Sequence, residues 1–370
     1  MAEPLKNHFG ENIPYVISEM ISSVYPSFPQ NSFITESLED YAYLELMQRA
    51  WKIAHALRKY LPGDYSQAIN ILIASLGPKL ETTENFGMAP FLYLPHVFFV
   101  AEYGLNYFEV SMQAQYELTQ RFTAEFSLRP YLEKFPQETL AQLKIWVKDE
   151  SPHVRRLVSE GSRPRLPWAS RLCQFQKNPK PILKILELLK DDPSLYVRRS
   201  VANHLNDIGK DHPELLIKVT KQWLHEASEQ RCWLVHHALR SAIKRGDLQA
   251  LAVLGFNKPV RITIHQSNIT PSIVSIGESI NVQFSIKNTD CKIQKLLVDF
   301  RIHFIKSNGK SSQKVFKLKK IKLEGGEILE LNKRVSLAEM TTRKHYPVIH
   351  LIDVLINGQV VHLGKFELVK

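Results

Sequence analysis

Acidic, arginine and tryptophan side chains come together in the run Glu160-Gly161-Ser162-Arg163-Pro164-Arg165-Leu166-Pro167-Trp168. Two further acids lie about one helical repeat away on either side, Glu125 in Thr123-Ala124-Glu125-Phe126 and Asp207 farther along the chain. Carboxylates can oppose positive charge at a reacting centre and orient water, and arginine can bind phosphate groups. Glu125, Glu160 and Asp207 are therefore the candidate reactive set, provided that the fold brings them together.

A short motif before Glu160 occurs a second time. Val154-Arg155-Arg156 and Val197-Arg198-Arg199 each follow a turn that contains proline, and their valines are 43 residues apart. This spacing lies within the period of HEAT-like repeats, whose paired helices stack into a curved solenoid with a concave binding surface. In the repeat alignment Glu160 lies opposite Asn203, one helical turn before Asp207. The alignment predicts that the acids project from equivalent helices and line one groove.

Helical periodicity continues through the first two thirds of the chain. Pro130 is expected to end the helix that carries Glu125 near Arg129, and residues 164–167 are expected to form an ordered loop because proline disrupts a helix interior. The predicted helices are 37–60, 65–76, helices within 91–108 that break near Pro95 and Gly104, 111–128, 136–148, 152–159, 181–189, 194–207, 213–225 and 228–244.

The periodicity changes near Gly255, where alternating and β-branched residues begin. Turns such as Ser307-Asn308-Gly309 and Asn357-Gly358 separate these runs. About seven short strands in roughly a hundred residues are typical of an immunoglobulin-like β-sandwich. We therefore predict a HEAT-like α-helical solenoid at residues 1–256, followed by a β-sandwich at 257–370. The clearest predicted strands are 260–265, 279–287, 296–306, 312–318, 328–335 and 348–357.

The charge of the chain is unevenly distributed. The net charge is +11, and residues 258–370 hold 19 Lys or Arg against 9 Asp or Glu, a net charge of +10. Residues 1–257 are therefore close to neutral, at +1. A basic module joined to a balanced one favours a polyanion partner, with nucleic acid ahead of a membrane surface. A basic surface that only increases solubility is an equally good interpretation of the charge alone.

Composition excludes several classes of protein. The three cysteines Cys173, Cys232 and Cys291 are far apart and lack Cys-x-x-Cys spacing, which argues against a disulfide framework and a zinc site. No apolar run reaches the length of a transmembrane helix, and the first residues lack the pattern of an export signal. We expect a protein of the reducing cytoplasm.

Several of these motifs resemble the AlkC family of bacterial alkylpurine DNA glycosylases, which belong to the HEAT-like-repeat glycosylases. The likeness covers the whole chain, including the C-terminal domain that one branch of the family carries, and the run from Glu160 to Trp168 is its most specific part. The matching segments are Ala2-Glu3-Pro4-Leu5-Lys6, Arg49-Ala50-Trp51 with Leu61-Pro62, Thr123-Ala124-Glu125-Phe126, the run from Glu160 to Trp168, and Thr341-Thr342-Arg343.

The resemblance implies a monofunctional DNA glycosylase that releases cationic bases such as N3-methyladenine and N3-methylcytosine, without flipping the base into a deep pocket. It implies that Glu125, Glu160 and Asp207 stabilise positive charge at C1′ of the sugar and orient water, as carboxylates do in O-glycoside hydrolysis. Trp168 would contact the lesion or its sugar. Helix-end charge or a salt bridge is the structural alternative for Asp207, and packing on the solenoid is the alternative for Trp168.

Cationic residues would hold the DNA backbone around these acids. In ordinary HEAT repeats such arginines pair with acids of a neighbouring repeat, so both interpretations of the Val-Arg-Arg copies stay open. The same holds for the loop with Arg343 and Lys344, which either enters a DNA groove or forms a solvated turn. The candidate DNA-binding residues are Arg155, Arg156, Arg163, Arg165, Arg198, Arg199, Arg343 and Lys344.

The sequence also favours certain partners. We expect double-stranded DNA with alkylated bases as the partner of a monomeric enzyme, near the bacterial nucleoid, with no metal or organic cofactor. No lysine lies within the Glu160–Trp168 run, so amine-based lyase chemistry is not expected. The alternative is a noncatalytic HEAT-repeat scaffold that binds a protein partner or undamaged DNA.

Overall fold

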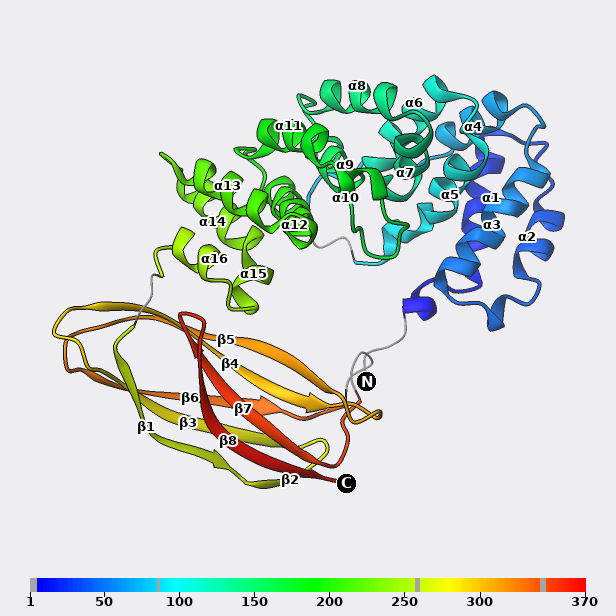
Figure 1. The fold of residues 1–370 in the computed structure, drawn as a ribbon. Helices are drawn as coiled ribbons and strands as arrows, with labels where there is room; N and C mark the ends of the chain where they lie inside the picture. Colours follow the sequence, from blue (N-terminus) through cyan, green and yellow to red (C-terminus); the bar gives the residue numbers. More distant parts are fainter. Residues whose placement is uncertain (1–4, 85–86, 257–259, 340–343) are drawn as a thin grey trace. The chain divides into compact units, whose positions relative to one another are not determined.

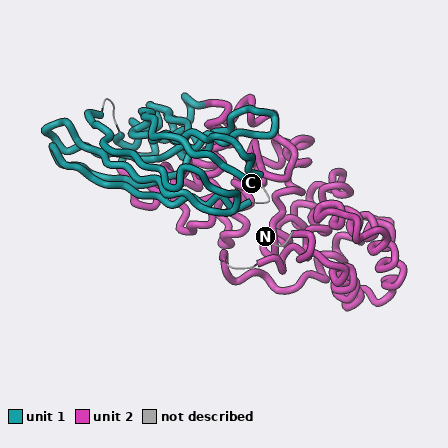
Figure 2. Tube along the Cα trace, turned by 90° about the horizontal axis from the view of Figure 1, so that it is seen from below, with its two compact units in different colours: residues 1–2, 213–225, 239–370 teal, residues 3–212, 226–238 magenta. Residues whose placement is uncertain are grey.

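The computed structural model describes residues 5–84, 87–256, 260–339 and 344–370. Within these residues, helices occupy the chain up to Val253 and eight strands follow (Figure 1). The chain forms two compact units (Figure 2). The helical unit contains Glu3–His212 and Glu226–Ala238, and the sandwich unit contains Pro213–His225 and Leu239–Lys370.

The helices are short and closely spaced along the chain. Three are 3₁₀-helices, η1 (Leu5–His8), η2 (Tyr41–Tyr43) and η3 (Ala89–Tyr93). The α-helices are α1 (Asn12–Val24), α2 (Gln30–Leu38), α3 (Leu46–Tyr60), α4 (Tyr65–Ala74), α5 (Leu94–Tyr103), α6 (Phe108–Thr119), α7 (Glu125–Lys134), α8 (Pro136–Trp146), α9 (Pro152–Glu160), α10 (Cys173–Lys177), α11 (Lys180–Leu189), α12 (Leu195–Asp211), α13 (Pro213–Leu224), α14 (Glu229–Ala238), α15 (Arg240–Lys244) and α16 (Leu248–Val253).

Local chemistry explains where many of these helices begin. The side chain of Asp64 accepts a hydrogen bond from the backbone N–H of Gln67 at 2.8 Å and caps α4. Proline occupies the first turn of α8 and α9, where a missing N–H leaves no broken hydrogen bond. As predicted, the helical pattern breaks near Gly104, because α5 ends at Tyr103, and a helix covers residues 152–159.

The predicted end of the Glu125 helix is wrong. Instead of ending near Arg129, α7 begins at Glu125 and continues to Lys134 with Pro130 inside it. Leu128, Tyr131 and Leu132 in this helix have no exposed surface. Burial of each such side chain is worth about 1.5–3 kcal/mol, which together outweighs the roughly 3 kcal/mol cost of an interior proline. Glu125 therefore lies at the positive end of the helix dipole, where a carboxylate is favoured.

Other predicted helices are divided. The predicted helix 37–60 is broken by Asp40, whose φ of 56° is left-handed, so that α2, η2 and α3 replace it. The predicted helix 111–128 becomes the end of α6 and the start of α7, and 228–244 becomes α14 and α15. The prediction omitted α1, α10 and α16.

The sandwich unit contains two β-sheets. A three-stranded sheet has the order β1-β3-β6, and a five-stranded sheet has the order β2-β8-β7-β4-β5. The strand pairs are antiparallel except β2 with β8. The strands are β1 (Ile262–Thr270), β2 (Ile273–Ser275), β3 (Ser279–Asn288), β4 (Gln294–Ile305), β5 (Ser311–Leu323), β6 (Ile328–Ser336), β7 (Ile349–Ile356) and β8 (Gln359–Val369).

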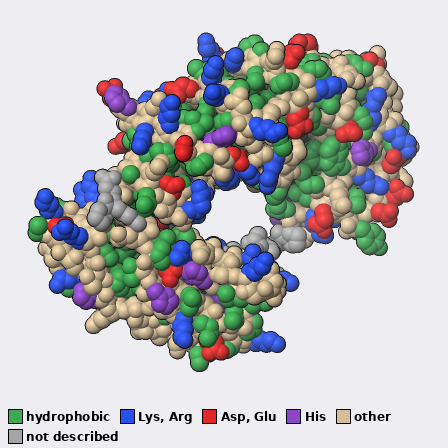
Figure 3. All heavy atoms as spheres, viewed as in Figure 1, with side chains coloured by type: hydrophobic (Ala, Val, Ile, Leu, Met, Phe, Trp, Pro, Cys, Tyr) green, Lys and Arg blue, Asp and Glu red, His purple; other side chains and the backbone are tan. Residues whose placement is uncertain are grey.

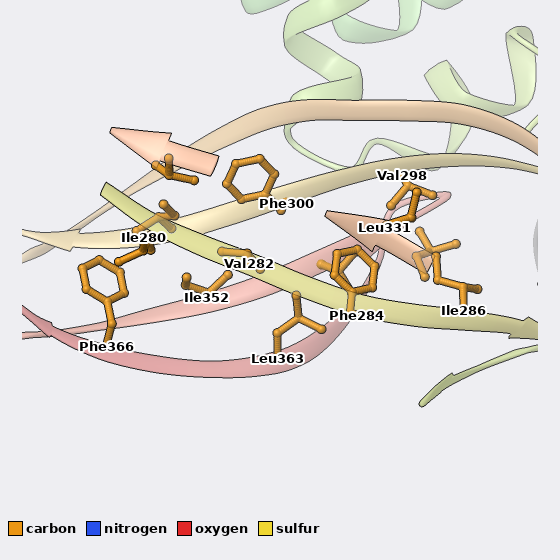
Figure 4. Close-up of a cluster of buried hydrophobic side chains, with 14 of the residues drawn as sticks. Ile280, Val282, Phe284, Ile286, Val298, Phe300, Leu331, Ile352, Leu363 and Phe366 are labelled. Atoms are coloured by element: carbon orange, nitrogen blue, oxygen red, sulfur yellow. The ribbon is translucent and has the colours of Figure 1, made fainter. Parts of the chain in front are cut away.

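The inner faces of the two sheets form one hydrophobic core (Figure 4). Phe284 of β3, Phe300 of β4 and Phe366 of β8 are each 1% exposed. Alternate residues of one strand face this core, as Ile280, Val282, Phe284 and Ile286 of β3 do. This alternation in sequence was the signal that predicted the sandwich.

The predicted turns are confirmed. Gly309 between β4 and β5 has a φ of 73°, and Asn357 and Gly358 between β7 and β8 have φ of 45° and 76°. The short β2 and the long β8 were not predicted, although the Asn357-Gly358 turn is a typical hairpin signal before β8.

Three helices belong to the sandwich unit, namely α13, α15 and α16. The turn at Gly246 approaches Gly358, where an added Cβ on Gly358 would lie 3.1 Å from Gly246 O and 2.8 Å from Leu251 Cδ1. The predicted domain boundary between 256 and 257 adjoins residues 257–259, which lie outside the described residues. The boundary stays a prediction.

Candidate active site

Glu125 is the first residue of α7. Its Oε2 accepts a hydrogen bond from Thr123 Oγ1 at 2.9 Å and lies 2.8 Å from Arg156 Nη1. Among the residues that the structure describes, none donates a hydrogen bond to the other oxygen, Oε1. The protein therefore holds the Glu125 carboxylate through one oxygen and leaves the second able to bind another group.

Glu160 ends α9 and is 6% exposed. Arg163 Nη1 donates to its Oε1 at 2.6 Å, and Ser200 Oγ donates to its Oε2 at 2.6 Å. Burial raises the pKa of this carboxyl, but the charges of Arg156 and Arg163 and the two hydrogen bonds outweigh burial and lower the pKa overall. Glu160 is therefore ionised at neutral pH.

Asp207 lies on α12 and is 1% exposed. Arg163 Nε donates to its Oδ2 at 2.8 Å, and Lys210 Nζ donates to its Oδ1 at 2.8 Å. Arg163 thus bridges Glu160 and Asp207, and these two acids raise its pKa despite the opposing effect of burial. The three acids were predicted to line one groove. Asp207 is separated from Glu160 by Arg163, and in this position it can orient the arginine.

Arg156 joins the two acids at the front of the site. Its Nη1 lies 2.8 Å from Glu125 Oε2, and its Nη2 lies 3.7 Å from Glu160 Oε1. The guanidinium carbon lies 5.2 Å from the centre of the Tyr196 ring, which is cation–π geometry. Burial lowers the pKa of Arg156, but the charges of Glu125 and Glu160 outweigh it and raise the pKa overall. Arg156 therefore stays charged and holds the two carboxylates in one cluster.

The loop after α9 is held by close packing and by a buried arginine. A Cβ on Gly161 would lie 2.6 Å from Leu128 Cδ2 of α7, so glycine allows the end of α9 to approach the helix of Glu125. Arg129 is 1% exposed and donates to the carbonyl oxygens of Gly161, Arg163 and Ser170. The loop that carries Arg163 is thereby fixed at both of its ends.

Trp168 lies on this loop and is 62% exposed. Its φ of 64° is left-handed, a conformation that costs about 1–2 kcal/mol for a residue other than glycine. The alternative in which Trp168 packs on the solenoid therefore does not describe its position. The loop presents the indole to solvent at the edge of a cavity.

This cavity lies within the helical unit and has a volume of about 330 Å³. Most of its wall is apolar, and Glu125, Arg156 and Glu160 supply charged groups at one side. The apolar wall strengthens electrostatic interactions because it excludes water from around the charges. The other lining residues are Leu80, Gly87, Pro90, Phe91, Phe122, Thr123, Phe126, Leu166, Pro167, Trp168 and Tyr196.

The remaining predicted DNA-binding residues differ in exposure. Arg155 donates to Asp192 of the next repeat at 2.6 Å, and Arg165 donates to Asp211 at 3.0 Å. Arg198 is 8% exposed and donates to the carbonyl oxygens of Asp192 and Pro193. Arg198 and the buried Arg163 therefore have internal roles, which corrects their assignment to the DNA backbone.

Two predicted cations are accessible. Arg199 and Lys344 are exposed, whereas Arg343 lies outside the described residues. On the face shown in Figure 3, Lys and Arg side chains are interspersed with Asp and Glu side chains over the helices. On this face, surface charge alone therefore does not mark a site.

Sequence reasoning missed four residues that organise the site: Thr123, Arg129, Tyr196 and Ser200. Thr123 lies two residues before Glu125 and was visible as part of the motif. Ser200 is 40 residues from its partner Glu160, and Arg129 is 32 residues from Gly161, so local patterns contain no signal for these contacts.

No group of three or more His, Cys, Asp or Glu side chains in the described residues is arranged to hold a metal ion. The described helices include none with the length and apolar character needed to span a membrane.

Comparisons with known proteins cover the entire chain. The structure superposes on that of the Pseudomonas fluorescens alkylpurine DNA glycosylase AlkC bound to DNA containing an abasic site analog, with a TM-score of 0.92, 39% identity and 100% of both chains covered. The sequence is 38% identical to the uncharacterized protein YhaZ of Bacillus subtilis over 98% of this chain and 99% of that protein. Residues 263–370 match the family described as the C-terminal Ig-like domain of YhaZ. The predicted helical-repeat region followed by an immunoglobulin-like domain is confirmed.

Proposed function

Because the chain belongs to the family of AlkC and YhaZ, we propose that it is a DNA glycosylase that releases alkylated bases. Its substrates are cationic N3-alkylated bases, N3-methyladenine and N3-methylcytosine among them. The observation that carries the proposal is the buried chain of ion pairs that holds Glu125 and Glu160 beside an apolar cavity. A structural ion-pair network needs no such cavity, whereas a reacting sugar does.

The chemistry of the leaving group explains this choice of residues. An N3-alkylated adenine is already positively charged and departs as a neutral base when its bond to C1′ breaks, so it needs no proton from the protein. Positive charge then develops on the sugar, and a fixed carboxylate beside it lowers the barrier. We assign this electrostatic role to Glu160, because Arg163 and Ser200 keep its carboxylate ionised and fixed.

We assign the attacking water to Glu125. Its Oε2 is held by Thr123 and Arg156, and its Oε1 accepts the hydrogen bond of a water molecule that faces C1′. The water oxygen bonds to C1′, and its proton passes to Glu125 and then to solvent. The product is an abasic site. Asp207 acts through Arg163, which it orients toward Glu160.

The deoxyribose of the lesion nucleotide occupies the apolar cavity, and the cationic base lies against the exposed indole of Trp168. This arrangement does not require a deep pocket for a flipped base. Cation–π attraction between the base and Trp168 contributes about 0.5–2 kcal/mol. Arg199 of the helical unit and Arg343 and Lys344 of the C-terminal domain contact DNA phosphates, so that both domains bind the duplex.

Base release tests the proposal directly. We expect the purified protein to release methylated base from methylated duplex DNA, to leave abasic sites, and to do so equally well in EDTA. Borohydride should trap no covalent adduct with DNA, since no lysine is among the described residues that line the cavity. A folded protein that binds DNA and releases no base would instead be a DNA-binding scaffold.

Azide distinguishes the two carboxylates. Glu125→Ala lacks the general base that accepts a proton from the attacking water. Azide can replace this water, because azide is an anionic nucleophile that attacks C1′ without losing a proton. We expect azide to restore base release in Glu125→Ala and to leave an azido sugar in the DNA. Glu160→Ala should gain little, because azide does not replace the carboxylate that stabilises the sugar. Rescue of Glu160→Ala alone would reverse the two assignments.

A further inference from the structure

Three helices of the helical unit, α9, α12 and α14, each carry a pair of side chains one helical turn apart. The pair on α9 is Arg156 and Glu160, and the pair 43 residues later on α12 is Arg199 and Asn203. The pair on α14 is Trp233 and His237, and His237 contacts Asn203 of the α12 pair. Residues four apart lie on one face of a helix, and α12 packs against both α9 and α14, so we treat the three pairs as a row across these helices.

Contacts between these helices keep the row continuous. Ser200 of α12 donates to Glu160, and His237 Nε2 lies 3.2 Å from Asn203 Oδ1. The backbone of α14 is fixed to α12 through Asn206, which donates to Ala238 O at 2.7 Å. The row therefore lies within the helical unit, beside the acid cluster.

The chemistry of the row changes after α9. Arg156 is neutralised by Glu125 and Glu160, but no described residue forms an ion pair with the exposed Arg199. Where α9 has the carboxylate of Glu160, α12 has the amide of Asn203. The α12 and α14 part of the row thus has a cation and polar groups, and no carboxylate of its own.

The α14 pair also forms a flat surface. The rings of Trp233 and His237 are stacked, with centroids 5.1 Å apart and an angle of 7° between the planes. Trp233 is 38% exposed, so one part of the stacked pair faces solvent. A partly exposed aromatic pair that contacts Asn203, one helical turn after Arg199, suits the apolar side of a deoxyribose next to its phosphate.

We propose that Arg199, Asn203, Trp233 and His237 form a second DNA subsite, which binds the phosphodiester backbone beside the nucleotide held at the acid cluster. This inference rests on the proposed function. Adjacent packed helices are about 8–10 Å apart, and phosphates of one strand are spaced about 3.4 Å along the duplex axis. Arg199 therefore contacts a phosphate roughly two to three nucleotides from the lesion. The subsite supplies a cation for the phosphate, whereas Arg156 and Arg163 of the acid cluster are already paired with carboxylates.

Salt-dependent binding tests this subsite. The full-length protein is titrated with a labelled duplex that carries a stable abasic analogue, and affinity is measured over a series of salt concentrations. Arg199→Gln should weaken binding roughly tenfold at low salt and reduce the log–log salt slope by about 0.9, the value for one phosphate. Lys184→Gln is the matched control, because it removes an exposed charge from α11 of the same repeat. It should change neither quantity.

A phosphate-by-phosphate scan locates the contact. One methylphosphonate, which is uncharged, is placed at each position on either side of the abasic analogue. At one position the methylphosphonate should weaken DNA binding by the wild type as much as Arg199→Gln does. The same methylphosphonate should not weaken DNA binding by the Arg199→Gln variant any further. Trp233→Ala should weaken binding several-fold with an unchanged salt slope, because it removes packing and no charge.

The outcomes separate this inference from the proposed function. The subsite is overturned if Arg199→Gln binds DNA with the affinity and salt slope of the wild type. It is also overturned if the loss of affinity in Arg199→Gln adds fully to the loss caused by a methylphosphonate at every position. If the wild type releases no base, the proposed function fails, while the salt slopes still decide whether Arg199 binds a phosphate.

Discussion

Arg163→Met removes the cation between Glu160 and Asp207, and its effect on stability follows from burial. Arg163 lies 2.6 Å from Glu160 and 2.7 Å from Asp207, and the side chains of the three residues are 8%, 8% and 2% exposed. Removal of one member of a buried ion-pair network costs about 3–5 kcal/mol, because the remaining charges lose their partner. Methionine replaces most of the aliphatic part, so the loss reports mainly on charge.

The same substitution changes the pH dependence. The folded-state pKa of Glu160 is lowered, so its ion pairs contribute stability above the pKa of an unfolded glutamate, about 4.3, and lose it as pH falls through the lower folded value. Without Arg163 the pKa of Glu160 rises. The stability difference between variant and wild type should therefore be largest at neutral pH and shrink in acid.

Urea denaturation followed by circular dichroism measures the stability, and single-turnover base release at each pH measures the activity. The acidic limb of the rate profile should move to higher pH in Arg163→Met, and alkaline buffer should restore part of the rate. Arg165→Met is the matched control, because its pair with Asp211 is about one quarter exposed and should contribute about 0.2–1 kcal/mol. A loss below about 1 kcal/mol in Arg163→Met, or an unmoved limb, refutes the buried bridge.

Three further changes test other parts of the site. Ser200→Ala removes the hydrogen bond to Glu160 Oε2, so its acidic limb should also move to higher pH while the rate in alkaline buffer stays near wild type; an unchanged profile would mean that Ser200 does not help to ionise Glu160. Trp168→Gly and Trp168→Ala should both weaken binding of a cationic lesion about two- to thirtyfold relative to an uncharged abasic analogue. Because φ is 64° at this position, the glycine variant should be at least as stable as the alanine variant, and a less stable glycine variant in thermal unfolding would contradict the strain. Lys344→Gln should reduce the salt slope of DNA binding by about 0.9 if the C-terminal domain contacts phosphate there, and an equal slope would exclude that contact.

The sequence predicted the order of the domains because its signals are local. Proline at helix starts, helical spacing before Gly255 and alternation after it each depend on neighbouring residues, so the chain reveals them without the fold. The Asn357-Gly358 turn is of this kind. The wrong end of the Glu125 helix shows the limit: Pro130 obeys a local rule, but burial of Leu128, Tyr131 and Leu132 against distant residues decides the outcome.

The acidic residues of the candidate site could be predicted from the sequence, but the residues that bind them could not. Glu125 and Glu160 stand in recognisable motifs, and the structure places both beside one arginine, Arg156. Arg163 was predicted to hold the DNA backbone, yet it is buried, because Glu160 and Asp207 neutralise its charge. Ser200 is an ordinary helix serine in the sequence, and only the packing of α12 against α9 gives it a partner.

The most direct test of the account compares the wild type with Glu160→Gln, which keeps the size of the side chain and removes its charge. Release of N3-methyladenine from methylated DNA and binding to a duplex with an abasic analogue are measured on the same preparations. We expect the wild type to release the base and the variant to release it about a hundred- to a thousandfold more slowly while DNA binding persists. Equal release by the two proteins would contradict a catalytic Glu160, and no release by a folded wild type that binds DNA would contradict the glycosylase itself.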